Sequence, residues 1–114
     1  MARPLKNNGV MPSSVNCKSP ELEAMILLNE HKKSFDVSKR FDSSFDVIMN
    51  YHRGKGATFE DAANAFDFLC FLSSKLRKEA IVRASEKREA GSVELINKSN
   101  SIDKIVTCLS YLVV

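Results

Sequence analysis

The longest helical pattern in the chain constrains its fold more than any other feature. Residues 58–90 contain no Gly or Pro, and their apolar side chains recur every three or four residues, which places them on one face of a helix. Thr58 and Asp61 have the spacing of a capping box, in which both side chains bond backbone N–H groups at a helix start. Gly91 is the residue type that commonly follows a helix end. We therefore predict one helix over this stretch, about 45 Å long.

One polar residue interrupts the apolar stripe of this predicted helix. The stripe consists of Phe59, Ala62, Ala63, Phe66, Leu69, Cys70, Ser73, Leu76, Ala80, Ile81 and Ala84. A helix of this length exceeds the width of a compact domain built from 114 residues. We expect either a second copy to cover the overhang in a two-fold dimer, or a bend near Ser73 and Ser74 to fold the helix back.

The front half of the same helix is apolar almost all round, so it must be covered on several sides or self-associate. We expect Phe66, Phe68 and Phe71 to lie in the core or in a helix–helix interface rather than to act as base-stacking platforms. If this half meets a helix of a protein partner, the predicted interface is Phe68, Leu72 and Leu76.

Two shorter helices are predicted before the long one. The first covers residues 20–33, because Ser19 can cap it and Pro20 suits the first helical position. Its predicted seam is Leu22, Met25, Ile26 and Asn29, widened by Leu27 and Leu28. The second begins at an Asp36 cap and ends at Gly54. Its seam is Val37, Phe41, Phe45, Ile48 and His52.

The glycine-rich loop 53–57 precedes the long helix and allows two interpretations. Flexible glycines beside a cation at a helix N-terminus can hold a phosphate. The loop lacks the spacing of a nucleotide-binding loop, and Glu60 and Asp61 already place negative charge in the first turn. We favour a plain turn between helices.

The C-terminal part is predicted to contain a fourth helix. Val93, Leu95 and Ile96 form a short apolar patch, which a polar turn over 97–101 follows. The last residues fit a helix capped by Ser101, while their β-branched content also suits a strand. We favour the helix, because a lone strand would lack a partner. The predicted fold is therefore all-α, with one domain of four helices over residues 19–114 built around the long third helix.

The charges divide the chain into a basic arm and a neutral body. Of 17 Lys and Arg residues, Arg3, Lys6 and Lys18 lie in the first 18 residues, and the remaining 14 equal the 14 Asp and Glu residues. Residues 1–18 are also rich in Pro, Asn and Ser, a composition that cannot bury enough surface to order itself. We interpret them as a flexible arm, which is either an ordinary frayed terminus or a segment that follows a nucleic-acid backbone.

A second group of cations occupies the rear half of the long helix. Its candidate nucleic-acid contacts are Lys75, Lys78, Arg83, Lys87 and Arg88. The alternative is a solvated face, because acids at the front and bases at the back suit the helix dipole, and Glu79 can pair with Arg83 one turn later.

The sequence predicts no catalytic, cofactor or metal site. His31 and His52 lack ligands at the spacings of zinc sites, and we expect His31 to interact with the helix dipole and His52 to be partly buried. Cys70 is the deepest thiol in the pattern, where apolar neighbours would raise its pKa and suppress the reactive thiolate. Asp42 and Asp46 share a helix face and are expected to be solvated carboxylates rather than a catalytic pair.

Three widely spaced cysteines argue against a secreted disulfide framework and favour a reducing, cytoplasmic compartment. No apolar run approaches the ~18 residues needed to span a bilayer, so we expect no membrane association.

Two functions remain. The first is a small regulatory protein that binds nucleic acid through its basic arm and the basic end of the long helix, as a homodimer. The alternative is a protein-interaction module, such as an adaptor, inhibitor or chaperone, that uses the Phe-rich helix.

Overall fold

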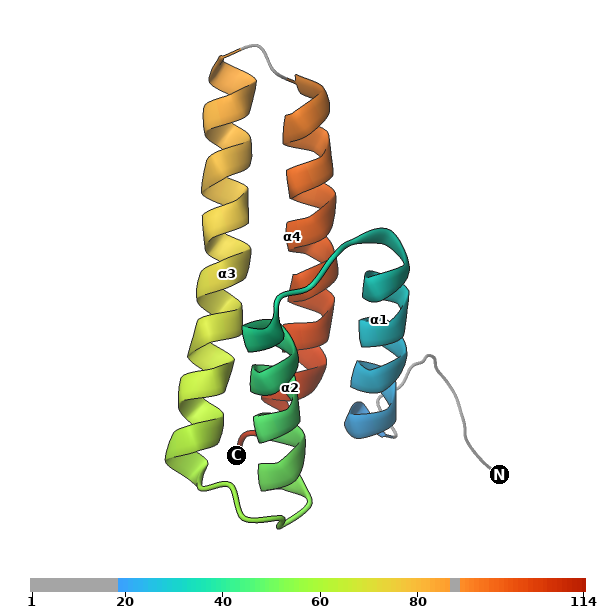
Figure 1. The fold of residues 1–114 in the computed structure, drawn as a ribbon, viewed down its shortest axis with the longest axis vertical. Helices are drawn as coiled ribbons and strands as arrows, with labels where there is room; N and C mark the ends of the chain where they lie inside the picture. Colours follow the sequence, from blue (N-terminus) through green and yellow to red (C-terminus); the bar gives the residue numbers. More distant parts are fainter. Residues whose placement is uncertain (1–18, 87–88) are drawn as a thin grey trace, which may run out of the picture.

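Two long antiparallel helices run the length of the molecule, and two shorter helices pack against one end of this pair (Figure 1). The computed structural model describes residues 19–86 and 89–114, with side chains from Gly91 onward in the second range. The helices are α1 (Pro20–Ser34), α2 (Lys39–His52), α3 (Phe59–Ser85) and α4 (Glu89–Ser110). The predicted all-α fold of four helices, with the third as the longest, is confirmed. The predicted arm 1–18 lies outside the described residues.

Local capping bonds explain where three of the helices begin. The Ser19 hydroxyl accepts a hydrogen bond from the Leu22 backbone N–H, as predicted for the start of α1. Thr58 and Asp61 form the predicted capping box at α3, with both reciprocal bonds at 3.1 Å. The predicted Asp36 cap of α2 is wrong, because Ser38 accepts from the Phe41 N–H and the helix begins at Lys39. Phe35 to Ser38 form an extended connection between α1 and α2 instead.

The long helix ends earlier than predicted, at Ser85, and the antiparallel helix α4 begins at Glu89. Gly91 does not end a helix but lies in the first turns of α4. A Cβ atom at that position would stand 2.9 Å from Arg83 Nη1, so glycine leaves room there for the Arg83 guanidinium.

The C-terminal segment is one continuous helix, as favoured, but the predicted turn over 97–101 is wrong. Ser99, Asn100 and Ser101 in this stretch form hydrogen bonds with other helices, whereas Asn97 is exposed. Ser99 is fully buried and donates to the Ser73 carbonyl, and Ser101 lies 2.7 Å from His31 Nδ1. These three polar residues in 97–101 are therefore explained by contacts between helices, and they do not indicate a loop.

The overhang of α3 is covered by α4, which packs beside it along its length (Figure 1). No bend occurs at Ser73 and Ser74, and α3 continues through both. The predicted stripe is buried or half-buried from Ala62 to Ala80, whereas Phe59 and Ile81 at its ends are exposed. A second copy is not required to shelter α3, and the dimer stays a prediction.

The centre of the apolar face predicted for α1 points outward, and only Leu27 and Leu28, which widened the predicted seam, pack against the core. Ala24 is fully buried, whereas Leu22, Met25 and Ile26 are 56%, 40% and 50% exposed. The inward face packs on α4 and consists of Ala24, Leu27, Leu28 and His31. A small residue at position 24 allows close approach of α1 to its neighbours, which the bulkier outward stripe does not. His31, predicted only as a partner of the helix dipole, is buried on this inward face.

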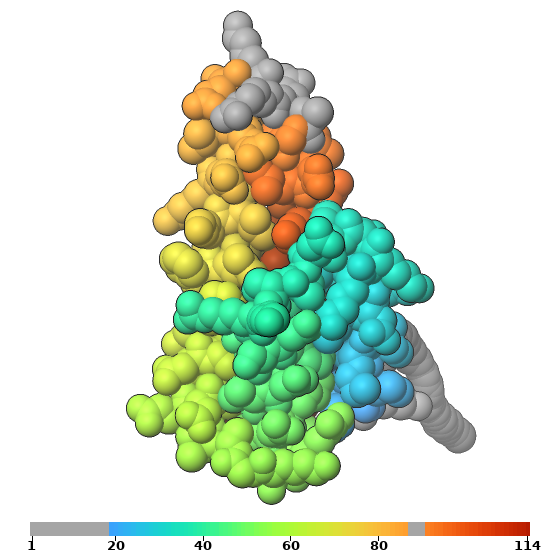
Figure 2. Space-filling view, in the orientation of Figure 1, coloured from blue at the N-terminus to red at the C-terminus, as the bar shows by residue number. Residues whose placement is uncertain are grey.

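The core lies at the end of the molecule where all four helices meet. Its buried apolar residues are Ala24, Phe41, Phe45, Ile48, Met49, Ala62, Ala65, Leu69, Ile102, Ile105, Cys108, Leu109 and Leu112. Beyond this end, the α3–α4 pair extends past α1 and α2, and Figure 2 shows the molecule narrowing there. The outer side of α3 is thus left uncovered by any other helix of the described chain.

Candidate nucleic-acid interface

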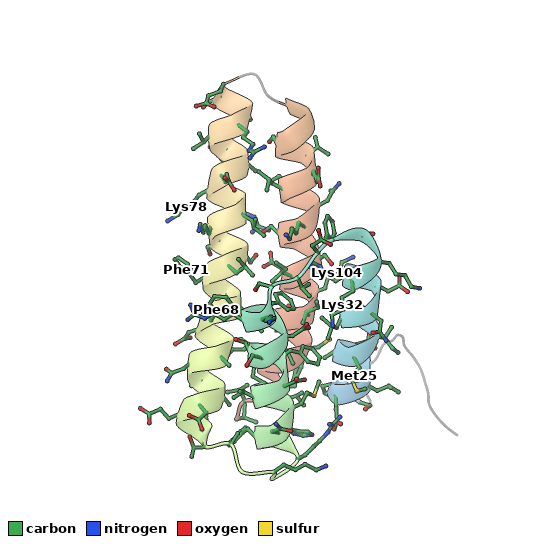
Figure 3. The ribbon with its side chains drawn as sticks, viewed as in Figure 1. Met25, Lys32, Phe68, Phe71, Lys78 and Lys104 are labelled. Carbon is green, nitrogen blue, oxygen red and sulfur yellow. The ribbon has the colours of Figure 1, made fainter. Side chains whose placement is uncertain are left out.

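The uncovered side of α3 combines two lysines with two exposed apolar residues. Phe71, Lys75, Lys78 and Val82 are spaced four, three and four residues apart, which aligns them along one helix face. We call these four residues the outer face of α3. All four are exposed, with Phe71 at 62% and Val82 at 51%. In Figure 3, Phe71 and Lys78 project from the same edge of α3, away from α4.

Ion pairing separates the cations of α3 into two classes. Arg77 Nη2 lies 2.7 Å from Asp103 Oδ2, and Arg83 pairs with Glu79 at 3.9 Å in the predicted i, i+4 order. Lys75 and Lys78 form no ion pair with any carboxylate in the described ranges. The predicted contacts Lys75 and Lys78 are therefore brought together as exposed, unpaired charges, while Arg83 is partly held by its own helix.

The ion pairing of five predicted nucleic-acid contacts cannot be assigned. Arg3, Lys6, Lys18, Lys87 and Arg88 are not among the described residues. The described part of the predicted interface therefore consists of Lys75 and Lys78 on the outer face of α3 and of Arg83 on the same helix.

The expectation that all three phenylalanines are sheltered is wrong for one of them. Phe66 and Phe68 are half-buried and pack against the core, but Phe71 stands in solvent. Arg40 from α2 covers Phe68, with its Cζ atom 4.1 Å from the ring centroid. Sequence reasoning missed Phe71, although its spacing of four residues from exposed Asp67 and Lys75 places it on their face.

The residues of the predicted partner interface are partly covered by other helices, and this interface stays a prediction. Phe68, Leu72 and Leu76 are half-buried and pack against the core. Little of their surface remains for a second protein, and the exposed apolar seam of this fold lies on α1 instead. Leu22, Met25 and Ile26 form that seam, which we call the outer seam of α1.

The charge along the outer side of α3 changes from negative before Phe71 to positive after it. Glu60 and Asp67 are exposed on the same side of the helix before Phe71, and Lys75 and Lys78 follow it. A polyanion would therefore be repelled on one side of Phe71 and attracted on the other.

Two other regions of the molecule contain cations that form ion pairs within the chain. In the loop 53–57, Arg53 Nε lies 2.6 Å from Glu21 Oε2, so its charge ties the loop to α1 rather than to an anion. A hollow of about 290 Å³ lies between the α1–α2 connection and α4. It is lined by Lys32, Lys33, Ser34, Phe35, Asp36, Glu94 and Lys98. Lys32 is paired with Asp42 at 2.8 Å and Lys33 with Glu30 at 3.4 Å, so this hollow has mixed charge.

The histidines and thiols lie in separate surroundings. His52 is exposed and lies 3.6 Å from Glu21 Oε1. Cys70 is only half-buried, so Cys108 is the deeper thiol, contrary to expectation. Burial, then the negative charges of Asp67 and Asp103, raise the pKa of the Cys70 thiol, which suppresses its thiolate.

Across the described residues, no three His, Cys, Asp or Glu side chains are grouped so that they could hold a metal ion. No helix in the same residues combines the length and apolar character needed to cross a bilayer. Compared with known proteins, the chain matches no family model, no curated protein and no solved structure.

Proposed function

We propose that the chain is a small, non-enzymatic regulatory protein that binds nucleic acid through the outer face of α3 and the basic arm 1–18. The observation that carries this proposal is the pair Lys75 and Lys78, which are exposed and unpaired while the described arginines of the same helix are in ion pairs. Unpaired lysines at neighbouring positions can bind successive phosphates and release their counterions.

The arm adds further cations to the proposed interface. Arg3, Lys6 and Lys18 carry the whole excess of positive over negative charge in the chain. Phosphate contacts of this kind give affinity with little sequence information, so we expect modest discrimination between sequences. Cys70 is a thiol rather than half of a disulfide, which supports a reducing, cytoplasmic location for this activity.

The test is a fluorescence anisotropy titration of labelled oligonucleotides with the full chain at low and moderate salt. We expect the double variant Lys75→Gln, Lys78→Gln to bind more weakly and to lower the slope of log affinity against log salt by about one to two. The triple variant Arg3→Gln, Lys6→Gln, Lys18→Gln should lower the slope further.

The matched control is Lys55→Gln with Lys104→Gln, which removes two exposed lysines from a loop and from α4. Its net charge equals that of the α3 double variant, so non-specific attraction changes equally. The proposal is rejected if the full chain shows no binding at low salt, or if both double variants weaken binding equally.

A second candidate function is a protein-interaction module that uses the outer seam of α1. Leu22, Met25 and Ile26 are exposed at the i, i+3, i+4 spacing by which helices recognise apolar partners. The partner that fits best is a second copy of this chain. Antiparallel pairing of two α1 helices places the acidic first turn, with Glu21 and Glu23, near the partner's basic last turn, with Lys32 and Lys33. Glu21, Lys32 and Lys33 also form ion pairs within their own chain, so the apolar seam is the main contact of this pairing.

A further inference from the structure

We infer that the outer face of α3 takes an unpaired nucleic-acid strand, with a base stacked on Phe71 and the adjoining phosphates on Lys75 and Lys78. This inference rests on the proposed function and narrows it from nucleic acid in general to strands whose bases are free to stack.

Phe71 is the feature that favours a base over a phosphate-only contact. This residue is 62% exposed, and its ring takes part in no ring or cation–π contact within the described chain. An aromatic ring next to cations offers a flat surface on which any base can stack, whatever its sequence.

The spacing along α3 matches this arrangement. Lys75 and Lys78 lie about 6 Å and about 10.5 Å from Phe71 along the helix axis, at 1.5 Å per residue. A strand with one base on the ring can therefore bring its next phosphates within reach of the two ammonium groups. Asp67 lies about 6 Å from Phe71 in the other direction, so the strand is expected to extend toward Lys78 only.

A duplex fits this surface less well. Base pairs in a duplex are read by donors and acceptors that reach their edges, and neither Phe71 nor Val82 has a polar side-chain atom. The bases of a duplex are also stacked on one another, so the Phe71 ring can stack on a base only if the duplex is opened.

An acidic amphipathic helix is the competing occupant. Such a helix requires apolar anchors at neighbouring turns, whereas Phe71 and Val82 are 11 positions apart, about 16 Å, with both lysines between them. The apolar contacts are therefore too far apart for a continuous seam, which favours a polyanion that carries flat rings.

The chain contains no tryptophan, so the variant Phe71→Trp introduces a single fluorophore at the proposed stacking position. We would titrate this variant of the full chain with an oligothymidylate of about 20 nucleotides, an abasic strand of equal charge, and a duplex of equal length. Stacking predicts quenching of the tryptophan emission by the oligothymidylate and little quenching by the other two. The matched control is Phe59→Trp, which is similarly exposed on the same helix but lies beside Glu60 and Asp61.

The variants Phe71→Ala and Phe59→Ala measure the same contact in affinity. Loss of one stacked base should weaken oligothymidylate binding about tenfold in Phe71→Ala. The abasic strand should bind this variant and the unchanged chain equally, and Phe59→Ala should retain oligothymidylate binding. Far-UV circular dichroism of each variant verifies that its helices are retained.

The outcomes distinguish this inference from the proposed function. Binding that depends on Lys75 and Lys78 but not on Phe71, or that is equal for duplex and single strand, overturns base stacking and leaves phosphate binding in place. Absence of binding to every oligonucleotide overturns both. Quenching by poly-glutamate equal to that by the oligothymidylate overturns the nucleic-acid strand and identifies an acidic polypeptide surface.

Discussion

Ser73, the one polar residue in the apolar stripe of α3, is explained by its partners on α4. Its hydroxyl donates to Asp103 Oδ1 at 2.5 Å, and the Ser99 hydroxyl donates to the Ser73 carbonyl at 3.0 Å. The other carboxylate oxygen of Asp103 accepts from Arg77 at 2.7 Å. These bonds can all form in only one alignment of the two helices, so the network specifies their register.

His31 is the buried ionisable side chain of α1. Its ring stacks on Phe41 with a centroid distance of 5.5 Å, and Nδ1 lies 2.7 Å from the Ser101 hydroxyl. Nε2 is buried without a hydrogen-bond partner among the described residues. Burial, and then the positive charge of Lys98 on α4, lower the pKa of His31 below its ordinary value of 6.5.

Acid should therefore weaken the fold through His31. Above about pH 6.5 the imidazole is neutral in both folded and unfolded chains, and the contribution of His31 to stability is fully present. As the pH falls below that value, the unfolded chain takes up the proton more readily, so the free energy of unfolding decreases. Urea unfolding followed by circular dichroism at about pH 7.5 and about pH 5.5 measures the difference.

The control for this prediction is His31→Leu, which has no proton to gain. Its free energy of unfolding should change less than that of the unchanged chain between the same two pH values. An equal change in both proteins would contradict a role for His31.

At the scale of the element, α1 shows that a helix can be located correctly while the centre of its buried face is assigned to the wrong side. The sequence of α1 carries apolar residues on two opposite sides, one with Ala24 and Leu28 and one with Leu22 and Ile26. The spacing of apolar residues in the sequence does not distinguish the buried side of α1 from the exposed side. The side with the small Ala24 packs against the neighbouring helices, and the bulkier side remains outside.

The continuity of α4 can be tested at Asn97, an exposed residue in the predicted turn that the structure places inside the helix. The variant Asn97→Pro should lower the free energy of unfolding by about 3 kcal/mol, because proline removes a helical N–H bond and clashes with the preceding turn. Urea unfolding measures this loss.

A proline placed in a true connection supplies the comparison. Asp36→Pro follows Phe35, whose φ of −140° and ψ of 145° suit a residue before proline. We expect a much smaller change there. Equal tolerance of proline at both positions would mean that residues 97–101 form a turn.

At the scale of the whole molecule, the two ends have different constructions. Among the described residues, four helices enclose the core at one end, whereas α3 and α4 are the helices that form the other end (Figure 1). The outer face of α3 is exposed because none of the other described helices covers it. The outer seam of α1 is exposed on another helix, so the two proposed surfaces can be altered independently.

The second candidate function predicts the mass of the protein in solution. Light scattering after size exclusion should give a dimer at micromolar concentration, and Ile26→Asp should convert it to a monomer because a charge in the paired seam is not compensated. The matched control is Ile81→Asp, which places the same charge at a 64% exposed isoleucine on α3 and should leave the mass unchanged. A monomeric mass for the unchanged chain would reject α1 pairing.

The sequence by itself determined the elements of this protein. Helix starts at Ser19 and Thr58 follow from hydrogen bonds to residues three positions away, and the helical period follows from the spacing of apolar residues within a few turns. All of this information is local, so the all-α fold and the start of its central helix could be predicted, whereas the predicted end of that helix lay beyond the observed end at Ser85.

The tertiary structure alone decided which faces are buried and which are left for function. Ser73 and Ser99 are 26 positions apart, and His31 and Ser101 are 70 apart, so no local pattern records that they bond. Likewise, Lys75 and Lys78 could be named from their charge, but the exposure of Phe71 beside them depends on where α2 and α4 pack. Burial is a property of side chains brought together from distant positions, which is why the candidate interface required coordinates as well as sequence.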